Sequence, residues 1–236
     1  KRSTVFSSQI FKWGMRSAAI FIFALLSYFS LKDYHYSRVA QMQTVTVPPG
    51  QRAQITLADG TKVWLNSQST MSYAANFGRN ERNVQLDGEA YFEVAKNKKI
   101  PFYVHTELNT VKVVGTRFNI CAYKGSKEFE ATLVEGIVDV YSADGNNKIT
   151  RLQKDDFFSN NNGKYGKMNT PSHEYLRWKE GLYCFDDVPF SNIMSKLEKY
   201  YNVKITVNNP QLLHYNGCTG KFREQDGIEH ILRTIA

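Results

Sequence analysis

VTVPPGQRAQITLADGTKVWLN, residues 45–66, is the stretch of sequence that decides the fold. Residues 54–57 and 62–65 alternate polar and apolar side chains, which is the pattern of a half-buried β-strand. Asp59-Gly60 lies between them, and Asp-Gly between two alternating runs is the strongest short-range signal for a β-hairpin. We therefore predict two antiparallel strands that are joined by a tight turn at Asp59-Gly60.

Turn signals recur about every 8–12 residues through the region that follows, which is the spacing of an all-β domain. The segments between them are rich in β-branched and aromatic residues. We predict an all-β domain over residues 44–170, built as a sandwich, a barrel or a solenoid. Turns are expected at Asp87-Gly88, Glu135-Gly136, Asp144-Gly145 and Asn162-Gly163, and strands at AYFEV (90–94), PFYVHT (101–106), VKVVG (111–115), RFNICAY (117–123), FEATLV (129–134) and IVDVY (137–141).

Residues 171–236 have a different pattern, which predicts a small α+β domain of order βαββα. GLYCF (181–185), VKITV (203–207) and GCTGKF (217–222) are the predicted strands. Asp226 and Glu229 resemble an acidic capping box at the start of a second helix. The first helix follows Pro189, and its apolar face is expected to contain Phe190, Ile193, Met194, Leu197, Tyr200 and Tyr201.

Toward the N-terminus, residues 13–31 read WGMRSAAIFIFALLSYFSL and predict a single transmembrane helix. Nineteen residues make about 28 Å of helix, which is just enough to cross a bilayer core. Trp13 and Tyr28 suit the two membrane interfaces, and the long stem of Arg16 can return its charge to the headgroups. A cleaved signal peptide and a buried core helix are the alternatives, although no A-x-A-like cleavage site follows and no face of the run is polar.

Basic residues flank the apolar run unequally, which predicts its orientation. Residues 1–16 contain Lys1, Arg2, Lys12 and Arg16 without an acid, whereas Lys32 and Arg38 after the run accompany Asp33. The positive-inside rule then places residues 1–12 in the cytoplasm as a short stub. Residues 32–43 form a polar linker, and the rest of the chain lies beyond the membrane. The missing initial Met, and the lack of a further strand after Ala236, lead us to expect a fragment at both ends.

Composition and motifs exclude several classes of function. Of the net charge of +8, residues 1–38 carry +5, because they hold six Lys and Arg against one Asp, so no basic stripe remains for a nucleic acid. No P-loop, G-x-S-x-G, H-E-x-x-H or C-x-x-C is present, and the five histidines are scattered singly, so neither a metal site nor a cofactor is predicted. Three cysteines exclude a disulfide framework. Cys184 and Cys218 could pair if their strands are neighbours, or all three could be buried thiols.

One dipeptide, Gly115-Thr116, has the residue types for chemistry on its own backbone. A Thr hydroxyl can attack the carbonyl of the preceding residue, which converts the amide into an ester that water then hydrolyses. Gly allows the strained geometry that this attack requires. The alternative is a β-bulge between two strands.

Residues 45–141 resemble the periplasmic domain of FecR-like anti-sigma factors. The matching stretches are VPPGQRAQITLADGTKVWLNSQS (47–69), VQLDGEAYFEVAKNKKIPFYVHT (84–106), VKVVGTRFNICAY (111–123) and ATLVEGIVDVY (131–141). Residues 178–207 and TGKF (219–222) resemble the domain appended to this family, which is similar to secretin/TonB N-terminal signalling modules. Together these stretches cover about four-fifths of the chain.

The resemblance implies a regulator that crosses the bacterial inner membrane once. In the family, a cytoplasmic domain holds an extracytoplasmic-function sigma factor, and the periplasmic part senses the signalling domain of a TonB-dependent outer-membrane transporter. Periplasmic and intramembrane proteases then degrade the anti-sigma factor and release the sigma factor. The sigma-binding domain is missing from this sequence, which corresponds to the anchor and the sensor. The resemblance also implies self-cleavage at Gly115-Thr116, since some relatives cleave at a matching Gly-Thr.

We predict that the C-terminal module docks the transporter through an exposed edge strand, because small modules of this class pair by adding strand to strand. The candidate residues are Leu182, Tyr183, Phe185, Lys221, Phe222 and Arg223. Plain core packing is the alternative for the aromatic members.

Three other functions remain open at the level of sequence. A membrane-anchored carbohydrate-binding domain would need exposed aromatic residues, for which Trp64, Tyr91 and Phe92 are candidates, although they alternate as core positions do. An envelope enzyme has no catalytic motif in its favour. A structural scaffold would have no effect on transcription when deleted.

Overall fold

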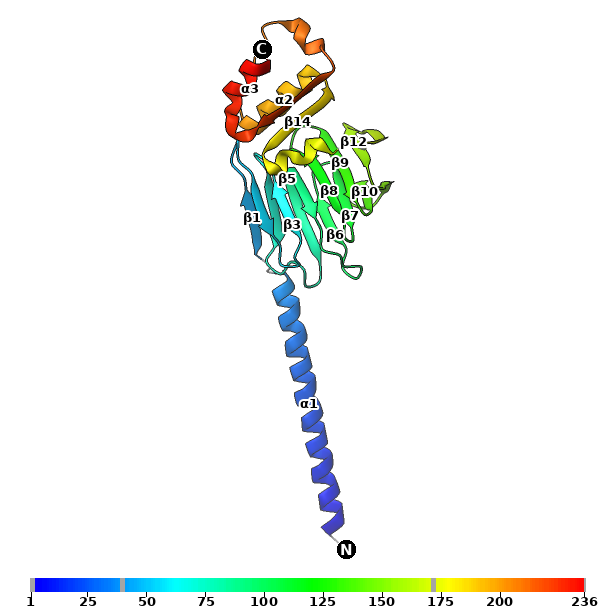
Figure 1. Cartoon of the computed structure of the whole chain (residues 1–236). Helices are drawn as coiled ribbons and strands as arrows, with labels where there is room; N and C mark the ends of the chain where they lie inside the picture. Colours follow the sequence, from blue (N-terminus) through cyan, green and yellow to red (C-terminus); the bar gives the residue numbers. More distant parts are fainter. Residues whose placement is uncertain (1–2, 39–40, 171–172, 236) are drawn as a thin grey trace. The chain divides into compact units, whose positions relative to one another are not determined.

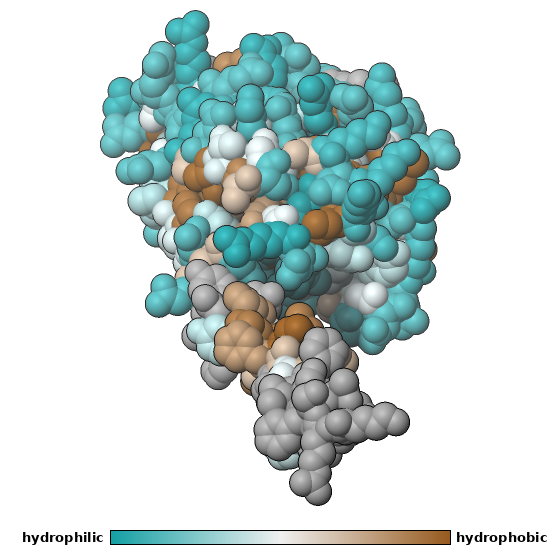
Figure 2. All heavy atoms as spheres, turned by 90° about the horizontal axis from the view of Figure 1, so that it is seen from below, coloured by the Kyte–Doolittle hydropathy of each residue, from teal (hydrophilic) through white to brown (hydrophobic). Residues whose placement is uncertain are grey.

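The computed structural model describes residues 3–38, 41–170 and 173–235 of the chain, which falls into two separate units, Lys1–Gln41 and Met42–Ala236 (Figure 1). The first unit is the helix α1, Ser3–Arg38. Within it, Trp13–Leu31 is long and apolar enough to cross a membrane, and none of that span is buried. Figure 2 shows brown, apolar side chains on the described part of this helix, whereas the face of the second unit seen in this view is mainly hydrophilic.

The hairpin predicted at Asp59-Gly60 is confirmed. Strands β2 (Ala53–Thr56) and β3 (Lys62–Leu65) are antiparallel, with Ile55 opposite Val63. In the turn, Gly60 has a φ of +85°, and the Asp59 carboxylate accepts hydrogen bonds from the Thr61 backbone N–H at 2.9 Å and hydroxyl at 2.8 Å. The turn chemistry therefore sets the register of the two strands.

Strand β5 (Arg82–Glu93) belongs to both layers of the fold. Its first half pairs with β4 (Thr70–Ala74) and β6 (Phe102–His105), and its second half pairs with β3 and β8 (Arg117–Ala122). The turn predicted at Asp87-Gly88 is therefore wrong. The strand bends at Gly88, where φ is +120° and a Cβ would lie 2.3 Å from Ser69 Oγ, so only glycine fits.

The remaining strands complete a two-layer sandwich (Figure 1). One layer contains β1 (Met42–Thr46), β4, the start of β5, β6, β7 (Asn109–Val113), β10 (Val138–Ser142) and β11 (Lys148–Leu152). The other contains β2, β3, the end of β5, β8, β9 (Glu128–Glu135), β12 (Asp156–Asn161) and β13 (Lys164–Asn169). Alternate side chains of both layers form one buried core. Of the three predicted architectures, the sandwich is the one observed.

Aromatic rings in this core connect the two layers. Phe92, on β5, stacks on Phe118 of β8 with ring centroids 5.0 Å apart. The same ring meets Phe102 of β6 edge-to-face at 5.9 Å. All three side chains are fully buried, so they contribute both apolar burial and ring geometry to the packing.

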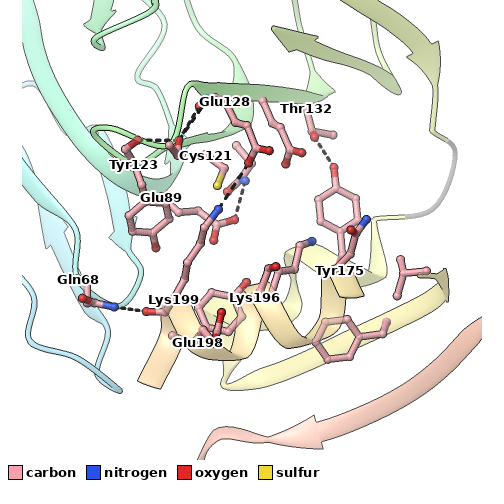
Figure 3. A pocket seen from close by; sticks show the side chains of 18 of the residues that line it. Gln68, Glu89, Cys121, Tyr123, Glu128, Thr132, Tyr175, Lys196, Glu198 and Lys199 are labelled. Carbon is pink, nitrogen blue, oxygen red and sulfur yellow. Dashed lines mark hydrogen bonds and ion pairs between the residues drawn. The ribbon is translucent and has the colours of Figure 1, made fainter. Parts of the chain in front are cut away.

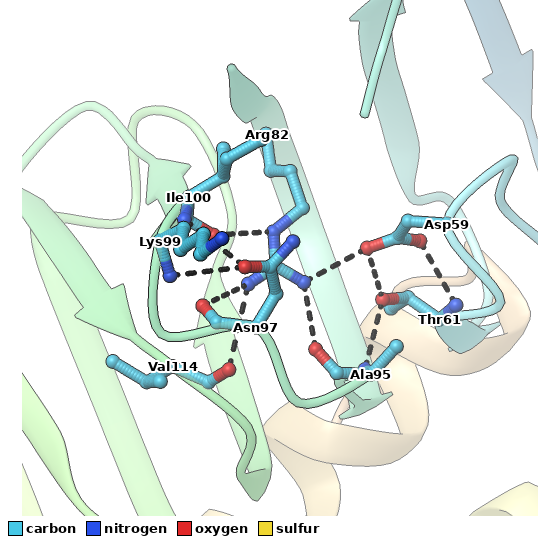
Figure 4. Close-up of polar contacts among 8 residues, drawn as sticks. All are labelled: Asp59, Thr61, Arg82, Ala95, Asn97, Lys99, Ile100 and Val114. Carbon is cyan, nitrogen blue, oxygen red and sulfur yellow. Dashed lines mark hydrogen bonds and ion pairs between the residues drawn. The ribbon is translucent and has the colours of Figure 1, made fainter. Parts of the chain in front are cut away.

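A buried arginine closes one end of the core, as Figure 4 shows. The Arg82 guanidinium pairs with Asp59 at 3.0 Å although the Arg82 side chain is only 1% exposed. It also donates hydrogen bonds to the carbonyls of Ile100 and Ala95, both at 2.7 Å, and to those of Asn97 and Val114. The charge is tolerated in the interior because a carboxylate and several carbonyls together satisfy it.

The C-terminal part is a small α+β module. It contains the 3-10 helix η1 (Glu174–Glu180), β14 (Leu182–Val188), α2 (Phe190–Tyr201), η2 (Pro210–His214), β15 (Cys218–Arg223), η3 (Glu224–Asp226) and α3 (Gly227–Ile235). Strands β14 and β15 form an antiparallel pair. The predicted apolar face of α2 is buried as expected, with Tyr201 at its margin only partly covered.

Two local predictions for this module are wrong. VKITV, residues 203–207, is not a strand, since in the described part of the chain no neighbouring strand completes a ladder with it. Its Ile205 and Val207 still pack against the module core, which accounts for the alternating sequence. The second wrong prediction is the acidic capping box of Asp226 and Glu229 at the start of the last helix. Asp226 instead accepts a hydrogen bond from the Arg223 backbone N–H and so caps the η3 turn, and α3 begins after that turn, at Gly227.

Candidate interaction surfaces and the Gly115-Thr116 junction

The C-terminal module packs on the outer side chains of the sandwich. Trp64, Tyr91 and Val134 point outward from β3, β5 and β9 and join the apolar core of the module. On the module side, the cluster includes the fully buried Trp178 and Leu197. Outward-facing aromatic residues on a sheet are thus covered, so Trp64 and Tyr91 do not form the exposed platform that carbohydrate binding by these residues requires.

Polar contacts surround this apolar cluster. The Gly50 N–H donates to the Tyr200 carbonyl at 2.8 Å, and the Ser67 hydroxyl donates to the same carbonyl. Arg52 forms an ion pair of 2.8 Å with Glu224. The first two contacts let the sandwich satisfy a carbonyl at the C-terminal end of α2. They join residues that lie far apart in the sequence, so no short-range sequence pattern predicts them.

Two of the six residues proposed for docking lie in the module core. Tyr183 and Phe185 are 4% and 5% exposed, and Tyr183 stacks on Tyr200 with centroids 4.4 Å apart. For these two, the alternative of core packing is the correct interpretation. Leu182 and Phe222 are half-buried.

Lys221 and Arg223 are the exposed members of the set, and both lie on β15. Lys221 Nζ pairs with Glu174 at 2.8 Å. This hydrogen bond raises the pKa of Lys221, and together with Arg177 it lowers the pKa of Glu174. Among the described residues β15 pairs only with β14, so the outer edge of β15 keeps its backbone donors and acceptors for another strand.

The proposed Cys184–Cys218 bridge does not form. Their strands are neighbours, but the register places Cys184 opposite Lys221 and Cys218 opposite Val188. All three cysteines are free.

The Gly115-Thr116 junction lies between β7 and β8 and is tightly enclosed. A Cβ at Gly115 would lie 2.7 Å from Lys96 Cα, so the close approach of two backbones demands glycine here. Thr116 is 4% exposed, and its hydroxyl donates to the Ile137 carbonyl at 3.0 Å. The β8–β9 register shifts between Arg117 and the next residue, which fits the β-bulge interpretation.

Charged side chains lie near this junction, while the Thr116 hydroxyl itself bonds to the Ile137 carbonyl. Arg117 pairs with Glu135 at 2.9 Å and lies 4.0 Å from Glu93. Gly136 follows Glu135, and a Cβ on it would lie 2.9 Å from Thr116 Oγ1. The β9–β10 turn therefore presses on the junction and fixes the threonine side chain. Across the described ranges, no cluster of His, Cys, Asp or Glu is arranged to hold a metal ion.

Comparison with known proteins agrees with this architecture. Residues 43–139 match the FecR protein family, and residues 182–236 match the FecR C-terminal family. Two crystal structures of a candidate anti-sigma factor from Parabacteroides distasonis, at 1.65 and 2.50 Å resolution, are similar to this chain with a TM-score of 0.70 each. Their identities to it are 30% and 29%, they cover 82% and 83% of it, and it covers 90% of each. No curated protein gives a significant match.

A sandwich followed by a small α+β module, with these matches over both parts, defines an anti-sigma regulator. The chain belongs to the FecR family of anti-sigma factors.

Proposed function

We propose that this protein is a single-pass inner-membrane anti-sigma factor that relays the state of a TonB-dependent outer-membrane transporter to an extracytoplasmic-function sigma factor. The observation that carries the proposal is the order of parts: an apolar helix of membrane-spanning length, then the FecR domain, then the FecR C-terminal module. A regulator with this order of domains has its sensor on one side of a membrane and its sigma factor on the other.

The charge distribution supports an orientation with the N-terminus in the cytoplasm. Basic residues without acids precede the apolar run, and the positive-inside rule retains such a flank in the cytoplasm. The sandwich and the module then lie in the periplasm. An alkaline phosphatase fused after residue 235 should be active in intact cells, and an inactive fusion would reverse the proposed orientation.

The outer edge of β15 is the surface that we propose for the transporter's signalling domain. A strand edge without a partner strand offers main-chain hydrogen bonds to an added strand, and exposed side chains along it give specificity. Arg223 is a cleaner probe of this edge than Lys221, because reversing the charge of Lys221 would also place two acids together at Glu174.

Crosslinking in cells tests the relay. The tagged full chain is crosslinked in intact envelopes and captured, and its partners are identified by mass spectrometry. We expect one TonB-dependent transporter, with less of it captured by Arg223→Glu and an unchanged amount by Lys204→Glu, an exposed charge elsewhere in the module. Capture of peptidoglycan or glycan-linked material alone would favour a scaffold or a binding module. Equal capture by both variants would place the docking surface elsewhere.

We also propose that the chain cleaves itself between Gly115 and Thr116, and that periplasmic and intramembrane proteases act on the product. Thr116 Oγ attacks the Gly115 carbonyl carbon, and its proton passes to the Thr116 nitrogen, so the amide becomes an ester and a free amine. Water hydrolyses the ester to a Gly115 carboxylate and a Thr116 amino terminus. The fragments would stay associated, because β5 pairs with β8 and β7 with β10 across the cut.

Two substitutions test the cleavage on a denaturing gel. Wild type and Thr116→Ser, which keeps the hydroxyl, should each give two bands, and Thr116→Ala should give one. Two bands from Thr116→Ala, or a single band from wild type, would exclude self-cleavage at this site.

A further inference from the structure

A cavity of about 690 Å³ lies between the outer face of the sandwich and α2 (Figure 3). Its sandwich wall is formed by outward-facing residues of β5, β8 and β9, which carry Glu89, Asn119 and Glu130. Its other wall is α2, from which Lys199 reaches toward the strands in Figure 3. Neither the transporter relay nor the Gly115-Thr116 junction uses these groups.

The sandwich wall contains buried polar side chains that hydrogen bonds hold in place. Glu89 is 6% exposed, and its two carboxylate oxygens accept hydrogen bonds from Asn66 Nδ2 at 2.8 Å and Asn119 Nδ2 at 3.0 Å. Because the Asn119 amide nitrogen donates its hydrogen bond to Glu89, the Asn119 Oδ1 faces away from Glu89 and can only accept. Asn119 is 4% exposed, and its Oδ1 has no donor among the described groups. A buried acceptor of this kind costs about 1–3 kcal/mol unless a donor reaches it, so it points to a ligand.

The neighbouring groups mix donors and acceptors. The carboxyl of Glu130 lies on the same wall, and burial raises its pKa, so it keeps its proton to a higher pH than a surface glutamate does. Lys196 and Lys199 line the opposite wall, and Lys199 lies 3.6 Å from Glu128 at the edge. Acids and ammonium groups face each other across the cavity. The charge of a strongly anionic or a strongly cationic ligand would therefore be repelled by one of the two walls.

Aromatic rings supply the apolar part of the wall. Tyr123, Tyr175, Phe185 and Tyr200 line the cavity, and Tyr175 is held by a hydrogen bond to Thr132. A few fixed polar groups beside aromatic surface are the usual composition of a small-molecule site.

We propose that this cavity binds a neutral, polyhydroxylated molecule, namely a mono- or disaccharide. Hydroxyl groups both donate and accept, so one ligand can donate to Asn119 Oδ1 and Glu89 while it accepts from Lys196 and Lys199. The apolar faces of a sugar ring suit the surrounding aromatic side chains, and the volume suits one or two rings. The binding goes beyond the proposed relay, because a small molecule would then act on the regulator directly at the junction of its two modules.

Isothermal titration calorimetry on the full chain in detergent tests the proposal. The probes are a panel of neutral mono- and disaccharides, together with glutamate, citrate and spermidine as charged competitors. We expect at least one saccharide to bind with a Kd below about 1 mM, and Lys196→Met to weaken it at least tenfold. Lys164→Met, an exposed lysine on β13 outside the cavity, should leave the affinity unchanged.

A second measurement uses only the wild-type chain, so a folding defect in the variant cannot affect it. Cys121 lines the cavity, so a bound saccharide should slow its alkylation in the wild-type chain, as followed by mass spectrometry. Absence of saccharide binding, preference for a charged probe, or equal affinity in Lys196→Met would overturn the proposal. Capture of the transporter does not depend on this cavity and would report separately on the proposed relay.

Discussion

Gly88 controls the passage of β5 from one layer of the sandwich to the other. Its φ of +120° is unfavourable for any other residue, and a Cβ would also lie 2.6 Å from Ser69 Cα. Replacement by alanine must therefore shift one strand against its neighbour. We expect Gly88→Ala to reduce the free energy of unfolding by about 3 kcal/mol, as measured by urea denaturation.

Gly145 provides the matched control, because it also has a positive φ, +75°, but a Cβ there meets nothing within 4 Å. Gly145→Ala should cost only about 1 kcal/mol, the conformational part of the penalty. Equal losses in the two variants would show that the approach of Ser69 does not constrain β5.

Arg82 is a second residue on which the sandwich depends. Removing its guanidinium would leave the Asp59 carboxylate, which is 11% exposed, and several carbonyls without their donor. We expect Arg82→Met to lower stability by about 3–5 kcal/mol. Arg177→Met is the control, since its ion pairs to Glu174 and Glu180 are largely exposed and such pairs contribute little. Thermal denaturation of both variants would test this, and a loss in Arg82→Met no larger than in the control would contradict it.

At the scale of elements, the pair β10–β11 should make part of the stability depend on pH. Arg151 and Lys148 on β11 pair with Asp139 on β10, each at 2.6 Å. The hydrogen bond from Arg151, followed by that from Lys148, lowers the pKa of Asp139 below its ordinary value of 3.8 despite partial burial. Its contribution is thus present above that value and lost as the pH falls through the lower folded pKa.

Asp139→Asn isolates this contribution. The variant should be less stable than wild type at neutral pH, and the difference should shrink as the pH falls below about 3.8, where the wild-type carboxylate takes up a proton. Urea denaturation at a series of pH values would measure it. A difference that stays constant over this range would show that the charge of Asp139 contributes nothing.

Elements defined by local chemistry were predictable, and those set by distant neighbours were not. The Asp59-Gly60 hairpin and the apolar face of α2 depend on turn residues and spacing that the sequence shows directly. Asp87-Gly88 has the same turn signal, but the approach of Ser69 turns it into a bend within β5. Residues 203–207 have the alternation of a strand, and only the absence of a partner strand in the described structure removes the ladder.

The cavity was missed because its residues are scattered over three strands and a helix. Glu89, Asn119 and Glu130 occupy polar positions that alternate with core residues, so by themselves they indicate only a solvent-facing side of a sheet. The register brings them together, and α2 covers them. A polar outer face that is covered by a second module cannot be recognised until the contact between the modules is known.

At the scale of the second unit, Met42–Ala236, the shared packing predicts that the sandwich and the C-terminal module unfold together. Tyr91 of β5 lies in the same buried cluster as Trp178 and Leu197 of the module, and Arg52 pairs with Glu224 across the same contact. Neither part would keep its surface covered if the other unfolded. We therefore expect one transition by near-ultraviolet circular dichroism and by proteolysis.

Leu197→Ala and Leu133→Ala test this coupling from its two sides. Both side chains are fully buried, the first in the module and the second in the sandwich, so each change should cost about 2–5 kcal/mol. If the unit is cooperative, both variants shift a single transition, and fragments of module and sandwich appear together during proteolysis. A Leu197→Ala variant that loses only the module while the sandwich keeps its midpoint would instead show a separable sensor. The cavity beneath α2 would then open while the sandwich stays folded.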